Sequence, residues 1–282
     1  MIARHSFRAM GTTVELVLSV DDGHATERPF AAAQREFERL EQVMSRFRAD
    51  SELSRLNAAG ELDASADLVD VLSLALDARE RTGGRFDPTV HDAVVAAGYD
   101  RSFELVPEDA ASAPHAARCG GGVEISGRRI RLERGVHLDL GGIGKGFAAE
   151  RAAELLALEA PALVSAGGDI AVRGAPDEGF WPVAVEDGPT LGLASGGLAT
   201  SGSDRRRWRR DGREQHHLID PASGAPAESD LLRVTAVGAD AVDAEVLAKV
   251  LFLDGRAAAE RAGVPAVLVT LDGETILTGG IA

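Results

Sequence analysis

A glycine-rich segment near the middle of the chain constrains the fold more than any other feature. From position 137 the sequence reads HLDLGGIGKGF, with four glycines inside six positions, and an Ala-, Glu- and Leu-rich helix is predicted over 148–158. Val136, Leu138 and Leu140 alternate with polar residues, which predicts a short strand before the glycines. Such a strand–turn–helix unit is typical of an anion site, because free backbone N–H groups and the helix dipole converge there.

Two charged side chains of this segment suit a nucleotide ligand. Lys145 places a cation where a phosphate would lie, and Asp139 suits a sugar hydroxyl, a ring N–H or a metal. The glycines allow the backbone to approach a ligand closely. However, the spacing matches neither the dinucleotide-binding G-x-G-x-x-G nor the phosphate-binding loop that ends in Lys-Ser/Thr. On this segment alone, an ordinary strand-to-helix turn and a nucleotide site both remain open.

Composition excludes several classes of protein. The 282 residues are 45% hydrophobic, enough for a full core, and carry a net charge of −15, which argues against nucleic acid and anionic membranes as partners. An anionic ligand therefore needs local cations or a metal. The single cysteine, Cys119, excludes an intrachain disulfide. No segment approaches the roughly 20 apolar residues of a membrane helix. The first residues show neither an apolar export signal nor a lipobox cysteine, so we expect a cytoplasmic protein.

Apolar periodicity predicts helices and strands along the whole chain. Helices are predicted over 28–47, over 65–82 and over 241–254. Two short helices are also predicted, one that Asp50 or Ser51 caps and one that ends at position 97. Strands are predicted over 12–20, 162–173, 181–185, 191–198, 231–237, 267–271 and 275–277, with a hairpin over 123–133, a solvated basic hairpin at 205–210 and a strand carrying His216 and His217. Residues 100–122 read as a loop, and Gly167-Gly168 as a bulge or a close backbone approach. With no repeat and no long linker, we expect one α+β domain over 1–282 with a mixed or antiparallel sheet.

Seven motifs in one order resemble a known family. They are Met10-Gly-Thr, Met44-Ser-x-Phe-x-x-Asp-Ser-Glu-Leu-Ser-x-Leu-Asn57, Gly84-x-Phe-Asp-Pro-Thr-Val90, Leu138-Asp-Leu-Gly-Gly-Ile-x-Lys-Gly146, Ser165-x-Gly-Gly-Asp169, Ala199-Thr-Ser-Gly202 and His217-x-Ile-Asp-Pro-x-x-Gly224. Together they resemble the ApbE family of FAD:protein FMN transferases. The resemblance implies an ApbE-type (T-fold-like) α+β fold with flanking helices. It also implies cleavage of FAD with Mg²⁺ and attachment of FMN through a phosphoester to a Thr or Ser of a target protein.

The resemblance also implies roles for individual residues. His217 matches the general base that acts on the incoming hydroxyl, and the carbonyl of Gly142 matches a metal ligand. Phe47 matches an aromatic position, commonly Tyr in the family, that stacks near the flavin. The implied FAD-binding positions are Met10, Phe47, Arg85, Phe86, Asp87, Asp139, Lys145 and Leu218. Without the motif, two adjacent strand histidines are more often a surface pair.

One helix departs from the family pattern. The family reads Asp-Ala-x-x-Thr there, with Asp and Thr one turn apart facing one ion. Here Glu245 takes the Asp position and Lys249 the Thr position. Glu245 can bind Mg²⁺, but an ammonium has no lone pair to donate. Either Lys249 pairs with Glu245 and replaces the ion on the pyrophosphate, or the register differs and Asp243 is the carboxylate in use. A plain i,i+4 surface pair worth about 0.2–0.5 kcal/mol is the third interpretation. We favour replacement of the ion, so that Lys249 joins His217 as a catalytic candidate.

Two classes of function follow. The first is an FAD:protein FMN transferase whose partners are FAD and an unidentified protein with an acceptor Thr or Ser. The second is an FAD-binding protein or FAD pyrophosphatase without protein flavinylation activity. The altered metal helix and the lack of an export signal favour the second class mildly.

Overall fold

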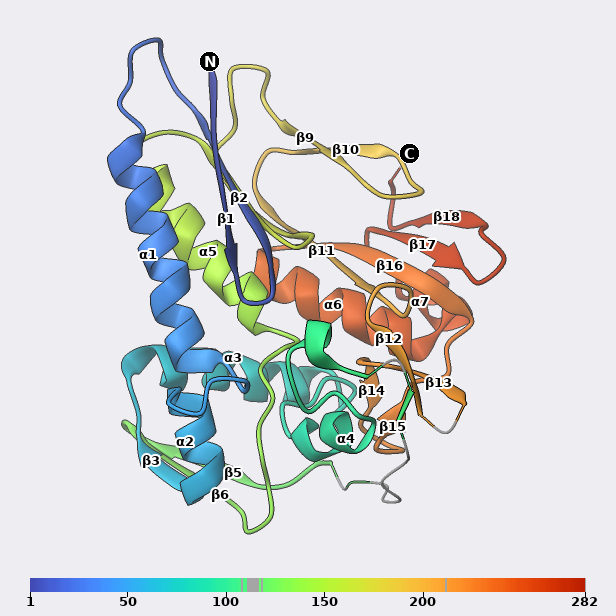
Figure 1. Ribbon diagram of the computed structural model, residues 1–282. Helices are drawn as coiled ribbons and strands as arrows, with labels where there is room; N and C mark the ends of the chain where they lie inside the picture. Colours follow the sequence, from blue (N-terminus) through green and yellow to red (C-terminus); the bar gives the residue numbers. More distant parts are fainter. Residues whose placement is uncertain (108, 111–116, 118, 211, 282) are drawn as a thin grey trace. The chain divides into compact units, whose positions relative to one another are not determined.

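The computed structural model describes residues 1–107, 109–110, 117, 119–210 and 212–281, and Figure 1 labels its helices and strands. The chain forms two compact units, each built from separate stretches of sequence. The first contains residues 1–41, 143–201 and 230–282, and the second contains residues 42–142 and 202–229. Helices and largely antiparallel sheets confirm the predicted α+β class. A single domain over 1–282 stays a prediction.

An eight-stranded sheet organises the first unit. Its strand order is β1 (Ile2–Ala9), β2 (Thr12–Ser19), β7 (Ala162–Ala166), β8 (Asp169–Arg173), β11 (Gly196–Gly202), β16 (Leu231–Gly238), β17 (Ala266–Thr270) and β18 (Thr275–Thr278). Pairings β1–β2, β2–β7, β7–β8, β8–β11, β16–β17 and β17–β18 are all antiparallel. Three of these pairs, β1–β2, β7–β8 and β17–β18, are hairpins joined by short turns, whereas longer segments connect the others.

Helices cover one face of this sheet. Helix α5 (Gly144–Ala157) packs against β7 and β8, and α6 (Ala241–Asp254) packs against β16, β8 and α5 (Figure 1). Helix α1 (Glu27–Met44) contacts β1, where the Phe7 and Phe37 rings meet edge to face. A short helix α7 (Arg256–Ala262) follows α6. Among the described residues, no helix is both long and apolar enough to cross a membrane.

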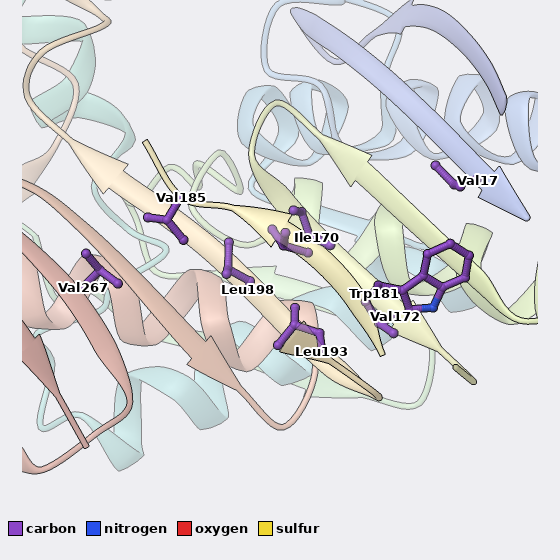
Figure 2. Close-up of a cluster of buried hydrophobic side chains, with 9 residues drawn as sticks. Val17, Ile170, Val172, Trp181, Val185, Leu193, Leu198 and Val267 are labelled. Carbon is purple, nitrogen blue, oxygen red and sulfur yellow. The ribbon is translucent and has the colours of Figure 1, made fainter. Parts of the chain in front are cut away.

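A small hairpin adds a second apolar layer. Strands β9 (Trp181–Ala184) and β10 (Thr190–Leu193) contribute side chains to a buried cluster with residues of β2, β8, β11 and β17 (Figure 2). On β8, Ile170 and Val172 join this cluster, whereas Asp169 contacts a side chain of α5. Side chains of a strand alternate between the two faces of a sheet, so the hairpin and the helices pack on opposite faces of β8.

The second unit combines helices with small sheets. Its helices are α2 (Glu52–Ala59), α3 (Ala66–Arg81), α4 (His91–Ala96) and the 3₁₀ helix η1 (Phe103–Leu105). Its sheets are β3 (Glu61–Asp63) with β6 (Arg129–Leu132) and β5 (Val123–Ser126), β13 (Arg213–His216) with β12 (Arg207–Arg210) and β4 (Asp109–Ala110), and β14 (Ile219–Asp220) with β15 (Ala225–Pro226). Ser51 caps α2 and Ser65 caps α3, which confirms the predicted helix starts. A buried cluster that includes Tyr99, Trp208 and Ile219 joins α4 to the strands after position 206.

The prediction of a strand over 136–140 is wrong, because the described structure does not pair this segment with a neighbouring strand. Leu138 is fully buried, but its backbone pairs with a side chain: the Leu138 N–H donates to Asn57 Oδ1 (2.8 Å), and Asn57 Nδ2 donates to the Leu138 carbonyl (2.9 Å). The next N–H, of Asp139, donates to the Pro88 carbonyl (2.8 Å). A side-chain amide thus provides the two bonds that a neighbouring strand would provide, and the apolar alternation alone cannot distinguish the two cases.

Other boundaries differ from the predictions for local reasons. Helix α5 begins at Gly144, so Lys145 belongs to its first turn instead of to a glycine turn before it. Gly167 and Gly168 form the turn of the β7–β8 hairpin instead of a bulge, with φ of 66° and 102°. The alternative prediction of a close approach is confirmed at Gly167, where a Cβ would lie 2.3 Å from Thr12 Oγ1. An additional strand, β1, precedes a hairpin turn at Met10 and Gly11, both with positive φ. His217 lies between β13 and β14 instead of on a strand. The loop predicted over 100–122 contains η1 and β4, and positions 108, 111–116 and 118 of it lie outside the described residues.

Replacing Asn57 tests the side-chain pairing of the second unit. Asn57→Ala leaves the N–H and carbonyl of buried Leu138 without these two partners, so we expect a loss of about 1–3 kcal/mol in the free energy of unfolding, measured in urea. Gln215→Ala is the control in the same unit, because the Gln215 amide donates to the neighbouring Glu214 carbonyl in an exposed contact and its loss should change stability by less than about 0.5 kcal/mol. Equal losses in the two variants would contradict the role given to Asn57.

Candidate functional site

A buried charge cluster joins three elements of the first unit. Lys145 on α5 donates to Asp169 on β8 and, at 2.8 Å, to Glu245 Oε1 on α6. The side chains of Asp169 and Glu245 are only 2% and 5% exposed, and that of Lys145 is 19% exposed. Two carboxylates and one ammonium therefore share a site with little water. The cluster is held together by Lys145.

Glu245 also occupies the N-terminus of α5. Its Oε2 accepts the Gly146 N–H at 2.9 Å, so the anion at this helix end is a carboxylate of the protein itself. A Cβ at Gly146 would lie 2.6 Å from the Ala241 carbonyl oxygen, which shows why this position has no side chain. The sequence predicted that the glycines allow close approach of a ligand. At Gly146, however, the segment that approaches the backbone closely is the start of α6, at Ala241.

The cluster shifts the pKa of two of its members. Burial raises the pKa of Asp169 well above its usual range, and repulsion from Glu245 adds to this while Lys145 opposes it. For Lys145, burial alone would lower the pKa, but attraction to Asp169 and Glu245 outweighs it and raises the pKa. Lys145 therefore stays charged at any physiological pH.

In the second unit an arginine is placed between two aromatic rings. The Arg46 guanidinium carbon lies 4.1 Å from the Phe47 ring centroid and 4.5 Å from that of Tyr99. Its Nε donates to Asp139 Oδ2 at 2.8 Å, and both side chains are more than nine-tenths buried. Arg46 Nη2 is buried with no hydrogen-bond partner among the described residues. Phe47 remains 42% exposed, so its ring is available to a flat ligand beside an unsatisfied N–H donor.

Two predicted site segments, 135 residues apart, meet within the second unit. Arg85 Nη1 lies 3.0 Å from Asp220 Oδ1, which joins the turn after α3 to the Asp-Pro turn after His217. Asp87 is buried, and its Oδ1 accepts from both the N–H and the hydroxyl of Thr89 (2.8 Å each). Phe86 is buried as well. Phe86 and Asp87 thus hold the shape of this turn.

The two adjacent histidines have different environments. His216 Nε2 lies 3.0 Å from the Ala227 carbonyl and its Nδ1 accepts the Leu218 N–H at 3.3 Å, so we assign the neutral Nε2–H tautomer. Burial lowers the pKa of His216, which agrees with this assignment. His216 is therefore a structural residue. His217 is half-buried between β13 and β14, and Leu218 beside it is buried.

The predicted site residues are divided between the two units. Lys145 and Glu245 meet directly in the first unit, which also holds Met10 and half-buried Lys249. The second unit holds the other predicted positions: Phe47, Arg85, Phe86, Asp87, Asp139, Gly142, His217 and Leu218.

Sequence reasoning missed three residues of these clusters. Arg46 had no assigned role, although it directly precedes Phe47. Asp169 was part of a motif, and its place at a strand start beside Gly-Gly was the available signal. Nothing in the sequence distinguished Tyr99 except that it is the only tyrosine of the chain.

Comparisons with known proteins identify the family. A family model described as the ApbE family matches residues 10–268. The FAD:protein FMN transferase of Klebsiella pneumoniae (strain 342) is 31% identical over 263 residues, which cover 84% of this chain and 74% of that protein. The FAD:protein FMN transferase of Treponema pallidum (strain Nichols) is 33% identical over 248 residues, covering 76% and 68%. The chain belongs to the ApbE family.

Solved structures share the fold. The crystal structure of the ApbE protein from Thermotoga maritima aligns with a TM-score of 0.85 at 24% identity, covering 99% of this chain and 97% of that one. The flavin transferase ApbE from Vibrio cholerae aligns with a TM-score of 0.80 at 25% identity, with the same coverage. The expected ApbE-type fold is therefore confirmed.

Removing the shared cation of the buried cluster should destabilise the protein strongly. Lys145→Met leaves two buried carboxylates facing each other, so we expect a loss of about 3–5 kcal/mol in unfolding free energy. Adding Asp169→Asn and Glu245→Gln to Lys145→Met removes the uncompensated charges and should recover most of that loss.

The control for this prediction is an exposed cation with the same number of partners. Arg256 also pairs with two carboxylates, of Glu260 and Glu274, but is 39% exposed. Arg256→Met should cost less than about 1 kcal/mol. Urea unfolding of the four proteins measures these differences, and a single Lys145→Met variant as stable as Arg256→Met would contradict the prediction.

Proposed function

We propose that this chain is an FAD:protein FMN transferase. The observation that carries the proposal is the alignment with relatives of that name over three quarters or more of the chain. The clusters described above support it, because they contain an exposed ring beside a buried arginine and a half-buried histidine near an Asp-Pro turn. No residue of these clusters requires a different chemistry.

In the proposed reaction, the hydroxyl oxygen of an acceptor Thr or Ser attacks the FMN phosphorus of FAD. The bond from that phosphorus to the bridging oxygen breaks, and AMP leaves with that oxygen. His217 accepts the hydroxyl proton as general base. Phe47 offers a ring face to the flavin, and the Arg46 Nη2 group offers a hydrogen-bond donor. Arg85 and Asp87 hold the shape of the turn over 85–90.

The family resemblance implies Mg²⁺, but the described residues do not fit it well. Both oxygens of Glu245 already accept N–H donors, from Lys145 and Gly146. Lys249 lies one helical turn from Glu245, on the same face of α6. Lys145 already lies between the Asp169 and Glu245 carboxylates, so a divalent cation at Glu245 would meet repulsion from its ammonium. We therefore assign charge neutralisation on the phosphates to Lys249 and derive no step through a metal.

An FAD pyrophosphatase is the second candidate. The altered α6 helix favours it, because Glu245 and Lys249 replace the Asp and Thr of the family pattern. In that reaction water replaces the acceptor hydroxyl, and the products are FMN and AMP.

Product analysis distinguishes these functions. The chain is expressed in cells, and the proteins are separated on a denaturing gel and scanned for flavin fluorescence. A transferase yields a fluorescent band in a protein other than this chain, and His217→Ala abolishes it. Purified protein with FAD alone then tests hydrolysis by release of FMN and AMP in equal amounts. The absence of a band together with equal release of FMN and AMP would replace the transferase by the pyrophosphatase.

The lysine assignment predicts little dependence on metal. FAD turnover by the wild type, whether as transfer or as hydrolysis, should change less than about twofold on adding EDTA, because a fixed ammonium supplies the positive charge. Lys249→Thr removes that charge and restores a hydroxyl ligand, so its activity should require Mg²⁺ and fall at least about 10-fold in EDTA. Lys249→Met is the matched control, which loses the charge without gaining a ligand and should not respond to Mg²⁺. Full EDTA sensitivity of the wild type would contradict the assignment.

A further inference from the structure

Two histidines and an aspartate converge in the second unit, on segments next to the predicted FAD-binding positions Asp87 and Asp139. His91 and Asp92 begin α4, and His137 lies in the extended segment before the glycines. Asp92 Oδ1 is 2.9 Å from His91 Nδ1, and both Asp92 oxygens are 2.9 Å from His137 Nδ1. One atom from each residue lies within 4.8 Å of the other two.

We propose that these three side chains bind one late first-row divalent cation, represented by Zn²⁺. Two imidazole nitrogens and one carboxylate oxygen form a donor set that suits Zn²⁺, whereas Mg²⁺ and Ca²⁺ prefer oxygen ligands alone. The His91 and His137 rings are 5.7 Å apart and inclined at 58°, so they are not stacked. Instead, their Nδ1 atoms converge on the same carboxylate.

The charge of Asp92 supports a cation at this place. Within the part of the chain that the structure describes, its side chain pairs only with the two histidines, and no lysine or arginine neutralises it. Other carboxylates of the same unit pair with arginines: Asp87 with Arg79, Asp139 with Arg46, and Asp220 with Arg85. Among the described residues, no fixed cation therefore stands beside the Asp92 carboxylate, and a bound divalent cation would supply that positive charge.

Backbone contacts hold the three ligands near one another without a metal. The Asp139 N–H donates to the Pro88 carbonyl at 2.8 Å, so the segment of His137 is fixed beside the turn that leads into α4. The Val94 N–H donates to the Val90 carbonyl at 3.0 Å and sets the first turn of α4. A site whose ligands are already positioned loses less conformational entropy on binding than one formed by mobile side chains.

Exposure of the ligands defines the kind of site. The side chains of His91, Asp92 and His137 are 23%, 42% and 36% exposed, so water can reach the cation. Three protein ligands leave a fourth position of a tetrahedral ion open. Because His137 lies two residues before Asp139, an ion here would tie α4 to the segment that pairs with Arg46. The inference concerns a second site and does not depend on the proposed transferase activity.

The test uses tag-free full-length protein without FAD, stripped of metals by a chelator. Titration with Zn²⁺ should show one tight site per chain, and Co²⁺ should give the visible absorption of an ion bound by nitrogen. His137→Asn and His91→Asn should each weaken Zn²⁺ binding at least about 10-fold, because even outer-shell changes at metal sites cost 10–100-fold. Zn²⁺ should also raise the melting temperature of the wild type more than that of either variant.

His24→Asn is the matched control. His24 also lies near a carboxylate, 3.9 Å from Glu159, but in the first unit and, among the described residues, without a second imidazole in the group. Its replacement should leave Zn²⁺ binding unchanged. A wild type that binds no stoichiometric Zn²⁺, or whose binding survives both His91→Asn and His137→Asn, would overturn the proposal and leave a hydrogen-bonded His–Asp–His cluster. If one variant fails to fold without metal, Asp92→Asn provides the same comparison with a side chain of nearly equal size.

Discussion

The first unit depends on one buried ammonium. Lys145 joins α5 to β8 and α6 through Asp169 and Glu245, which are 24 and 100 residues away in the sequence. Two carboxylates at this depth repel each other and are poorly solvated, so their positions depend on the cation between them. The close packing of α5 on α6 follows from the same contact, since Glu245 also accepts the Gly146 N–H.

The contacts of Glu245 bear directly on the metal site that the family resemblance implies. A carboxylate at position 245 suggests a metal ligand when the motif is read alone. In the fold, that carboxylate already has an ammonium and a backbone N–H as partners. Under the proposal made above for Lys249, a fixed positive charge of the protein takes the place of an ion.

Local signals in the sequence predicted most of the elements, and nonlocal contacts account for what was missed. Ser51 and Ser65 mark their helices because caps act within one turn. Apolar alternation predicts a strand over 136–140 because it does not reveal what the backbone bonds to, and here the partner is Asn57, 81 residues from Leu138. Family motifs include Phe47 and Asp139 among the candidates, but their side-chain partners Arg46 and Tyr99 lie at positions that the motifs leave undefined. Arg46 is the clearest case, because it acquires significance only when Tyr99 and Asp139 are placed around it.

The interleaving of the two units along the chain has a consequence for folding. The sheet of the first unit needs β1 and β2 from the beginning of the sequence and β16 to β18 from its end. The second unit needs residues 202–229 to complete what residues 42–142 begin. During synthesis, the first hairpin must therefore wait for β7 before it gains a neighbour in the sheet, and the buried lysine waits longer for Glu245. Pairings at such separations are slow to form and leave strand edges exposed meanwhile. The second unit therefore has all of its residues once position 229 has been made, whereas the first unit, although it begins earlier in the sequence, is completed only with residues 230–282.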